Sequence, residues 1–472
     1  MFSEEHNRYV LLQRDIRNPW LCDKKTVALL GCLMLPVTFF CATYVILFGI
    51  CDELGYPRPQ FDGFNAIEIL ERNQLRAELY SNTHAHGNYS EIPEEIPKDI
   101  HIHHADYTPE KLKLICYYNF PSNDFSLKIN EIDPNLCTHL NLAFASVVNH
   151  SIYLDEEHLG YLTNIIPLKE KNQYLKILLS IGGAGNNNGY PEMVKNHTNR
   201  KTFIQSVLNY VKDYKIDGVD LDWEFPGENS ADHYQKMHFT QLLSEIRKTI
   251  NKQPKYKFLL TVAVAAPNEI IDVAYDVSYM NEYVDFINLM SYDYHYYTKI
   301  TPFTGINSPL YQASNEKFYL STLNINYSSH YWNYLGMDKS KIVVGLPTYG
   351  HTFKLTNSEN HGLYAPALGF GHLGSLGFAS YSTICTFLQG NHISPIFDMD
   401  TFSPYAVKYY EWISFDDQQS LTYKAEYIKS NNFGGAMVYS LNADDYKGDC
   451  DMGTSSGIKF PLITAIKNVF DG

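Results

Sequence analysis

Apolar and polar residues along the chain follow three successive patterns. Residues 26–50 form one apolar run of 25 residues without a charge, which is long enough to cross a hydrocarbon core as a helix. Residues 51–110 lack sustained periodicity and are rich in Pro, Asn, Glu and His, a composition typical of a polar stalk. From residue 113 onward, short apolar runs alternate with longer amphipathic stretches, and this pattern predicts alternating strands and helices.

Eight of the short apolar runs are rich in β-branched and aromatic residues, as strands are. They span residues 113–120, 139–147, 175–183, 218–225, 257–266, 284–293, 341–350 and 434–441. Near-continuous apolar strands are typical of a parallel sheet that is covered by helices. Helical patterns lie between the runs, for example at 202–214 and 232–250. The pattern therefore predicts an α/β fold, a (β/α)8 TIM barrel.

One gap in this pattern is too long for a single helical crossover. The seventh and eighth runs are separated by residues 351–433, and the part from about 351 to 409 is rich in Gly, Tyr and Phe. We predict that this part forms a small inserted α+β subdomain between the seventh strand and the seventh helix, beside the barrel mouth. The predicted organisation is a cytosolic tail at 1–25, a transmembrane signal anchor at 26–50, a stalk at 51–110 and a barrel domain at 111–472.

Charges on either side of the long apolar run predict its orientation in a membrane. Basic residues precede the run between Arg8 and Lys25, whereas Asp52 and Glu53 follow it at once. The positive-inside rule then places the N-terminus in the cytosol and the barrel outside or in a lumen, as a single-pass type II membrane protein. A cleaved signal peptide is the alternative, although its apolar core would span only about 7–15 residues. A buried helix of a soluble protein is a further alternative.

Composition excludes several functional classes. Hydrophobic residues make up 45% of the chain and charged residues 19%, so the chain is not disordered in bulk. The net charge of -15 argues against nucleic acid or an anionic membrane surface as a partner. Five histidines cluster between residues 84 and 104 without cysteines or a ligand spacing, which favours a solvated linker over a metal site. We therefore predict no metal and no cofactor, and we expect a monomer.

Cysteines and glycosylation sequons are compatible with an extracytoplasmic barrel. The cysteines beyond the predicted anchor are Cys116, Cys137, Cys385 and Cys450. An even number in such a region predicts two disulfide bonds. The sequons beyond the anchor, each a candidate for N-glycosylation, are at Asn88, Asn149, Asn196 and Asn326. Sequons at this frequency can also arise by chance, so they are compatible with this location without establishing it.

The candidate chemistry concentrates in the fourth predicted strand. Alternate residues of a strand share one face, so Asp220, Asp222 and Glu224 point the same way, into the barrel. Carboxylates so close together cannot all be ionised, and one of their pKa values is expected to rise. Glu224 lies at the carboxyl end of the strand, where barrel active sites are found. A protonated glutamate in this place can act as a general acid, whereas Asp217 at the strand's start is expected to be structural.

These residues form the pattern Asp217-x-x-Asp220-x-Asp222-x-Glu224, which resembles the signature of glycoside hydrolase family 18, the chitinase family. SIGG at 180–183, MSYD at 290–293 and GLPTYG at 345–350 resemble motifs of that family's third, sixth and seventh strands. The stretches 137–145, 412–420 and 434–445 are similar to animal chitinases, and the resemblance covers residues 111–470. It implies the disulfides Cys116–Cys137 and Cys385–Cys450, and chitin or N-acetylglucosamine oligosaccharides as the partner.

The resemblance also implies substrate-assisted retention of configuration. Glu224 would protonate the glycosidic oxygen, and the substrate's own 2-acetamido oxygen would be the nucleophile. Asp222 would stabilise the resulting oxazolinium-like charge, and Asp220 would share a proton with Asp222. Tyr292 would hydrogen-bond the acetamido oxygen, and Ser180 would support Asp220. The resemblance implies a chitinase, and together with the anchor predicted at 26–50 it makes a membrane-anchored chitinase the leading hypothesis.

Residues expected by the same resemblance to contact the sugar are Tyr118, Phe120, Met290, Asp293, Tyr349, His351 and Tyr439. Three positions depart from the family pattern, since Phe120, Ala184 and Tyr439 stand where Trp is common. Lost aromatic stacking weakens sugar binding, so a chitooligosaccharide-binding lectin with little or no turnover stays the alternative. A hydrolase of chitobiose cores on glycoproteins is a third hypothesis. His351 stands where Arg is common, and it is expected either to make activity pH-dependent or to be a surface residue at the subdomain junction.

Overall fold

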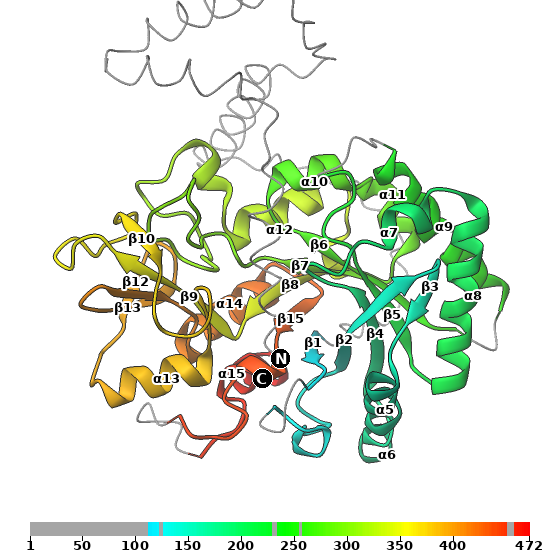
Figure 1. Cartoon of the computed structure of the whole chain (residues 1–472), viewed down its shortest axis with the longest axis horizontal. Helices are drawn as coiled ribbons and strands as arrows, with labels where there is room; N and C mark the ends of the chain where they lie inside the picture. Colours follow the sequence, from blue (N-terminus) through cyan, green and yellow to red (C-terminus); the bar gives the residue numbers. More distant parts are fainter. Residues whose placement is uncertain (1–111, 122–125, 229–233, 254–256, 451–456) are drawn as a thin grey trace, which may run out of the picture. The chain divides into compact units, whose positions relative to one another are not determined.

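Eight parallel strands close into a barrel, as the apolar pattern predicted (Figure 1). They are β1 Lys113–Asn119, β2 His139–Val148, β4 Lys176–Gly182, β5 Gly218–Asp222, β6 Leu259–Ala265, β7 Phe286–Met290, β8 Ile342–Pro347 and β15 Gly435–Tyr439. Each strand pairs in parallel with the next, and β15 pairs with β1. The sheet has no free edge in the barrel, and the predicted TIM barrel is confirmed.

The computed structural model describes residues 112–121, 126–228, 234–253, 257–450 and 457–472. The predicted anchor, the stalk and Asn88 lie outside these ranges. In the ranges themselves, no helix combines the length and apolarity needed to cross a membrane.

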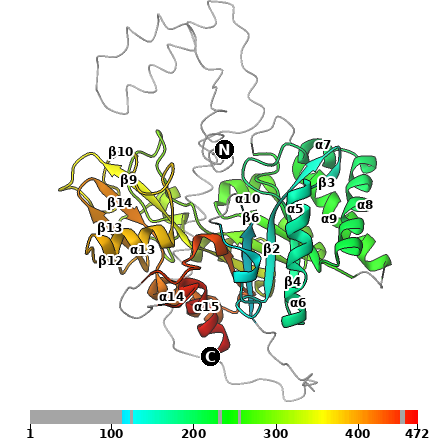
Figure 2. The same cartoon turned by 60° about the horizontal axis from the view of Figure 1, so that its bottom comes forward.

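Helices cover the outer face of the barrel strands (Figure 2). They are α5 Glu156–Ile165, α6 Leu168–Lys171, α7 Tyr190–Val194, α8 His197–Tyr214, α9 Gln235–Lys252, α10 Asn268–Ala274, α11 Val277–Tyr283, α12 Ile325–Tyr334, α14 Gln418–Ser430 and α15 Pro461–Asp471. Short 3-10 helices lie at Ile129–Glu131, Phe318–Thr322, Lys339–Lys341 and Leu441–Ala443. In α9 the buried residues Phe239, Leu242, Ile246 and Ile250 recur every three or four positions, so one stripe faces the strands.

A hairpin that the sequence pattern did not predict follows β2. The short strand β3 Ser151–Tyr153 pairs antiparallel with the end of β2. Asn149 and His150 form the two-residue turn with φ angles of 49° and 61°. Two-residue hairpin turns of this hand need positive φ at both positions, which Asn tolerates better than most residues.

A second, antiparallel sheet occupies residues 349–414, where the sequence pattern indicated an insertion at about 351–409. Its elements are β9 Tyr349–Leu355, β10 Ala367–Phe370, β11 Phe378–Ser380, α13 Tyr381–Gly390, β12 Ile396–Asp398, β13 Ser403–Lys408 and β14 Glu411–Ser414. The sheet starts earlier and ends later than expected because β9 follows β8 directly and pairs with β14. Tyr349 and His351 therefore lie on a subdomain strand.

Candidate active site

The three acidic residues of the fourth barrel strand lie on its inner face. Asp220 and Asp222 are buried on β5, and Glu224 is half-buried just beyond the strand's carboxyl end. Trp223 points outward and stacks on Tyr190 of α7, with the ring centroids 5.1 Å apart. The alternation predicted from the sequence is confirmed, and it brings the carboxylates to the mouth of the barrel.

Asp220 is the centre of a buried hydrogen-bond network. One carboxylate oxygen accepts from the Tyr117 hydroxyl at 2.6 Å and from the Ser180 hydroxyl at 2.8 Å. The other accepts from the Thr261 hydroxyl at 2.6 Å and from the Asn288 amide at 3.0 Å. Four donors stabilise a negative charge and hold the carboxylate in one orientation. The expected support of Asp220 by Ser180 is confirmed.

Tyr117 is a site residue that the sequence analysis missed. Burial raises the pKa of its hydroxyl, and the charges of Asp220 and Asp222 raise it further. Tyr118 was predicted to contact sugar, and this prediction is wrong. It is fully buried on the outer face of β1, where its hydroxyl donates to the Leu127 carbonyl at 2.9 Å. The alternation of β1 would have distinguished the two tyrosines, because Tyr118 shares a face with the disulfide-bonded Cys116.

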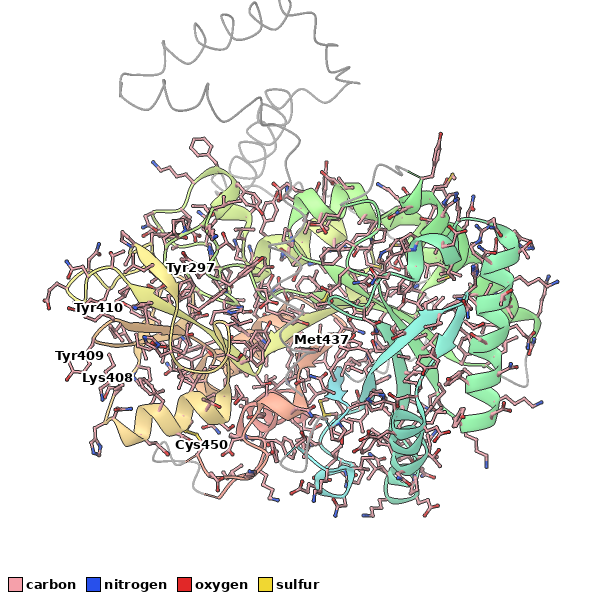
Figure 3. The ribbon with its side chains drawn as sticks, in the orientation of Figure 1. Tyr297, Lys408, Tyr409, Tyr410, Met437 and Cys450 are labelled. Carbon is pink, nitrogen blue, oxygen red and sulfur yellow. A yellow bond between two sulfur atoms is a disulfide. The ribbon has the colours of Figure 1, made fainter. Side chains whose placement is uncertain are left out.

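Aromatic rings form the floor of the barrel mouth. The ring of Tyr439 lies 6.2 Å from that of Tyr292 and 5.7 Å from that of Tyr117, measured between centroids. The Tyr292 hydroxyl lies 3.7 Å from the sulfur of Met437, which is seen near the centre of the molecule in Figure 3. Met290 is half-buried against the same cluster. The structure thus brings Tyr292, Met290 and Tyr439 together, as the sequence analysis expected.

A second cluster joins the loop after β7 to the subdomain. One oxygen of Asp293 accepts from the Tyr349 hydroxyl at 2.6 Å and lies 2.7 Å from Nε2 of His351. Asn307 accepts from the Asp293 backbone N–H at 2.9 Å and donates to the Tyr349 carbonyl at 3.2 Å. His351 is only 1% exposed, so the alternative of a surface histidine is wrong. The three predicted sugar-contacting residues of this cluster are in mutual contact.

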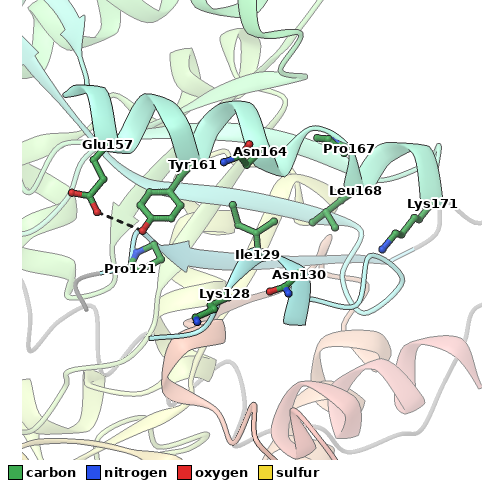
Figure 4. A pocket seen from close by; sticks show the side chains of 10 residues that line it. All are labelled: Pro121, Lys128, Ile129, Asn130, Glu157, Tyr161, Asn164, Pro167, Leu168 and Lys171. Carbon is green, nitrogen blue, oxygen red and sulfur yellow. Dashed lines mark hydrogen bonds between the residues drawn. The ribbon is translucent and has the colours of Figure 1, made fainter. Parts of the chain in front are cut away.

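Phe120 lies at the end of β1 against α5. Its ring centroid is 4.7 Å from that of His158 and 6.1 Å from that of Tyr161. Tyr161 also lines a cavity of about 570 Å³ between α5, α6 and the connection from β1 to β2, which Pro121 and Leu168 border (Figure 4). None of the acidic residues of β5 lines this cavity, so cavity volume does not identify the candidate site.

The residues predicted to be structural have the expected contacts. The Asp217 carboxylate accepts from the Lys169 ammonium at 2.6 Å and from the Ile177 backbone N–H at 2.9 Å, which anchors the start of β5.

Both disulfides implied by the resemblance are confirmed. Cys116 is bonded to Cys137 in the barrel, and Cys385 of α13 is bonded to Cys450.

The predicted glycosylation sites differ in accessibility. Asn149 is exposed in the turn before β3. Asn196 is exposed, and its side chain caps α8 by accepting from the Asn199 backbone N–H at 2.9 Å. Asn326 is half-buried in α12 and accepts from the Tyr427 hydroxyl at 3.0 Å. Of these three, Asn149 offers a sugar the least obstructed attachment.

The arrangement places a half-buried carboxyl, which can transfer a proton, beside a buried carboxyl that is held by four hydrogen bonds. Glu224 is partly exposed, whereas Asp220 and Asp222 are buried. In the described ranges, no three His, Cys, Asp or Glu side chains are placed to hold a metal ion. A carboxyl at the mouth, two buried carboxyls behind it and phenol hydroxyls are the chemical groups that the site provides for acid–base chemistry.

Comparisons with known proteins agree with this geometry. Residues 113–444 match the family described as Glycosyl hydrolases family 18. The chain is 37% identical over 370 residues to human chitinase-3-like protein 2, covering 75% of this chain and 92% of that protein. It is 35% identical over 370 residues to mouse chitotriosidase-1, covering 75% of this chain and 77% of that protein. Human YKL-39, described as a pseudo-chitinase with retained chitooligosaccharide binding properties, matches with a TM-score of 0.71 and 35% identity over 76% of this chain and 100% of its own.

Proposed function

The chain belongs to glycosyl hydrolases family 18, and we propose that it is a membrane-anchored chitinase that hydrolyses β-1,4 linkages between N-acetylglucosamine residues. The observation that carries this proposal is the complete carboxylate series on the inner face of β5. Glu224 is half-buried at the mouth, and Asp220 is held by four hydrogen bonds behind it. No acidic position of the series is replaced by a neutral residue.

In the proposed reaction, Glu224 donates its proton to the glycosidic oxygen as the bond from that oxygen to C1 breaks. The carbonyl oxygen of the substrate's 2-acetamido group forms a bond to C1, which gives an oxazolinium-like intermediate. Asp222 accepts a hydrogen bond from the acetamido N–H and stabilises the positive charge. Water then attacks C1 as the bond from C1 to the acetamido oxygen breaks, and the Glu224 carboxylate removes a proton from that water. The product keeps its configuration at C1 and regains its free acetamido group.

Asp220 and Tyr292 assist the formation of the oxazolinium-like intermediate. Four hydrogen bonds favour a negative charge on Asp220, and this charge favours a proton on Asp222 when the two carboxyls face each other. As Asp222 turns toward the acetamido group, that proton can pass to Asp220. Tyr292 lies in the aromatic floor beside Tyr439 and Met437, and we expect its hydroxyl to donate a hydrogen bond to the acetamido oxygen.

A chitooligosaccharide-binding lectin is the second candidate function. It is favoured by Ala184 and Tyr439, which replace Trp residues common in the family, and by the similarity to YKL-39, described as a pseudo-chitinase. Turnover and binding of chitotriose and chitotetraose by the full chain, from pH 3 to 8, separate the two functions. Binding without turnover favours the lectin, whereas turnover establishes the enzyme.

The contact between His351 and Asp293 predicts pH-dependent activity. Histidine loses its charge as the pH rises, whereas arginine stays charged. A positively charged donor holds the Asp293 carboxylate more strongly than a neutral one. His351→Arg is therefore expected to raise the ratio of kcat/KM at pH 7 to kcat/KM at pH 5 by about three- to tenfold. The same change at the exposed His361 is the control and is expected to leave the ratio unchanged. Superimposable pH profiles for His351→Arg and the wild type would contradict the prediction.

The proposed topology places the barrel outside the cytosol, with residues 26–50 as the anchor. Asn149 lies in an exposed turn, whereas Asn326 lies in α12 with its side-chain oxygen bonded to Tyr427. We therefore expect Asn149→Gln to remove one glycan from the protein made in animal cells, and Asn326→Gln to remove none. The measurement is gel mobility before and after endoglycosidase treatment. A wild-type protein without any glycan contradicts the proposed location.

A further inference from the structure

Two neighbouring asparagines join the carboxyl ends of three barrel strands. They belong to the loop between β4 and α7, residues 183–189. The Asn186 amide donates to the Gly182 carbonyl at 3.0 Å and to the Ala145 carbonyl at 3.1 Å, and its oxygen accepts from the Ser146 hydroxyl at 2.8 Å. Asn186 therefore ties β4 to β2.

Asn187 joins the end of β4 to the residues that follow β5. Its amide nitrogen donates to the Gly183 carbonyl at 3.0 Å and to the Glu224 carbonyl at 3.3 Å. Its amide oxygen accepts from the Glu224 backbone N–H at 3.1 Å. Both backbone polar groups of Glu224 are thus bonded to one side chain, which is itself attached to β4.

These bonds continue the pairing of β4 with β5 beyond the end of the strands. The last regular register pair is Gly182 with Asp222, and the Gly183 N–H donates to the Asp222 carbonyl at 2.8 Å. Glu224 lies two residues further on, beyond the end of β5. The Asn187 amide takes the place of a neighbouring peptide group and sets the direction in which the Glu224 side chain leaves the backbone.

We propose that Asn187 is a positioning residue for Glu224, an inference that rests on the proposed function of Glu224 as the general acid. The three hydrogen bonds of Asn187 all go to backbone groups, so its effect on the reaction passes through Glu224. A displacement of about 1 Å in a catalytic group can lower the rate by about 100-fold. Loss of Asn187 therefore lowers turnover more than it lowers substrate affinity.

The test compares Asn187→Ala with the matched variant Asn186→Ala in the full chain. Each variant removes three hydrogen bonds from the same loop, but only Asn187→Ala removes contacts to Glu224. We expect both to lower the thermal unfolding temperature to a similar extent. On chitotetraose, Asn187→Ala is expected to lower kcat at least about tenfold with KM within about threefold, whereas Asn186→Ala keeps kcat within about twofold.

A second readout does not depend on turnover. The titration of the Glu224 carboxyl is followed by carbon NMR of protein labelled at glutamate, with Glu224→Gln identifying the signal. Asn187→Ala is expected to shift its midpoint by about 0.5 pH unit or more, and Asn186→Ala is not, because only the first changes where the carboxyl lies.

The outcomes separate this inference from the proposed function. Equal losses of kcat in both variants, or a raised KM with unchanged kcat in Asn187→Ala, overturn the role of Asn187. A wild type that binds chitotetraose without turnover overturns the proposed function instead. In that case the titration of the Glu224 carboxyl tests the role of Asn187. A shift of the titration midpoint in Asn187→Ala alone supports the positioning of Glu224 by Asn187. The same midpoint in both variants and in the wild type overturns that role.

Discussion

Glu224→Gln is expected to lower kcat on chitotetraose by about 10²- to 10⁴-fold, the range that general acid catalysis contributes. Glutamine has the shape of glutamate but cannot donate a carboxyl proton to the glycosidic oxygen. The backbone of residue 224 stays bonded to Asn187, so the side chain keeps its direction. Chitotetraose should therefore bind within about threefold of the wild-type affinity. Release of shorter oligosaccharides and calorimetric titration measure the two quantities.

The control for this prediction is Glu192→Gln, the same chemical change at an exposed position on α7. Glu192 is 63% exposed and contacts Lys195, so its replacement is expected to leave both kcat and binding unchanged. Turnover by Glu224→Gln at the wild-type rate would remove Glu224 from the reaction. Loss of binding together with turnover would instead mean that residue 224 holds the substrate.

Lys424→Ala is expected to lower the free energy of unfolding by about 3–5 kcal/mol, because it breaks a buried ion pair. The Lys424 side chain is fully buried, and its ammonium contacts the Asp416 carboxylate and donates to the Ser308 carbonyl at 2.6 Å. Burial lowers the pKa of Lys424, and the charge of Asp416 opposes that shift. Alanine leaves the Asp416 carboxylate buried without its counterion. Denaturant unfolding of the full chain measures the loss.

An exposed ion pair provides the control for this prediction. Lys467 contacts Asp471 on α15, and both side chains are more than one-third exposed. Lys467→Ala is therefore expected to cost about 1 kcal/mol or less. The double variant Lys424→Met with Asp416→Asn removes both buried charges and should recover most of the loss. A loss for Lys424→Ala as small as that for Lys467→Ala would show that the buried pair does not stabilise the fold.

The pattern of apolar and acidic residues along the chain was enough to predict the barrel and the acidic inner face of its fourth strand. All eight barrel strands lie within the predicted apolar runs, give or take a residue at their ends. The orientation of Asp220, Asp222 and Glu224 follows from the two-residue period of a strand. The same rule applied to β1 would have selected Tyr117 in place of Tyr118, since Asp220 needs its partner on the inner face. Tyr118 was chosen from the family resemblance, although the alternation of inward and outward side chains along β1 would have pointed to Tyr117.

Contacts between distant residues needed the tertiary structure. The donors to Asp220 come from Tyr117, Ser180, Thr261 and Asn288, which are 40 to 103 residues away along the chain. Resemblance suggested Ser180. The other three are common polar residues within apolar strands, and nothing local marks them as partners of a carboxylate. The pairing of the four cysteines was likewise open from the residues alone, because four cysteines allow three pairings. Resemblance suggested the pairing that the structure contains.

By itself the sequence determined which residues lie on which face of each strand, because that depends on the local backbone period. It also determined that the chain alternates strands with helices, since the hydrophobic pattern is local too. The closure of eight strands decided which inner residues meet, and so surrounded Asp220 with donors from four of them. The parallel pairing of β4 with β5 placed Asn187, in the loop after β4, against the backbone of Glu224. Hydrogen bonds need their groups within about 3 Å, a condition that spacing along the chain does not express.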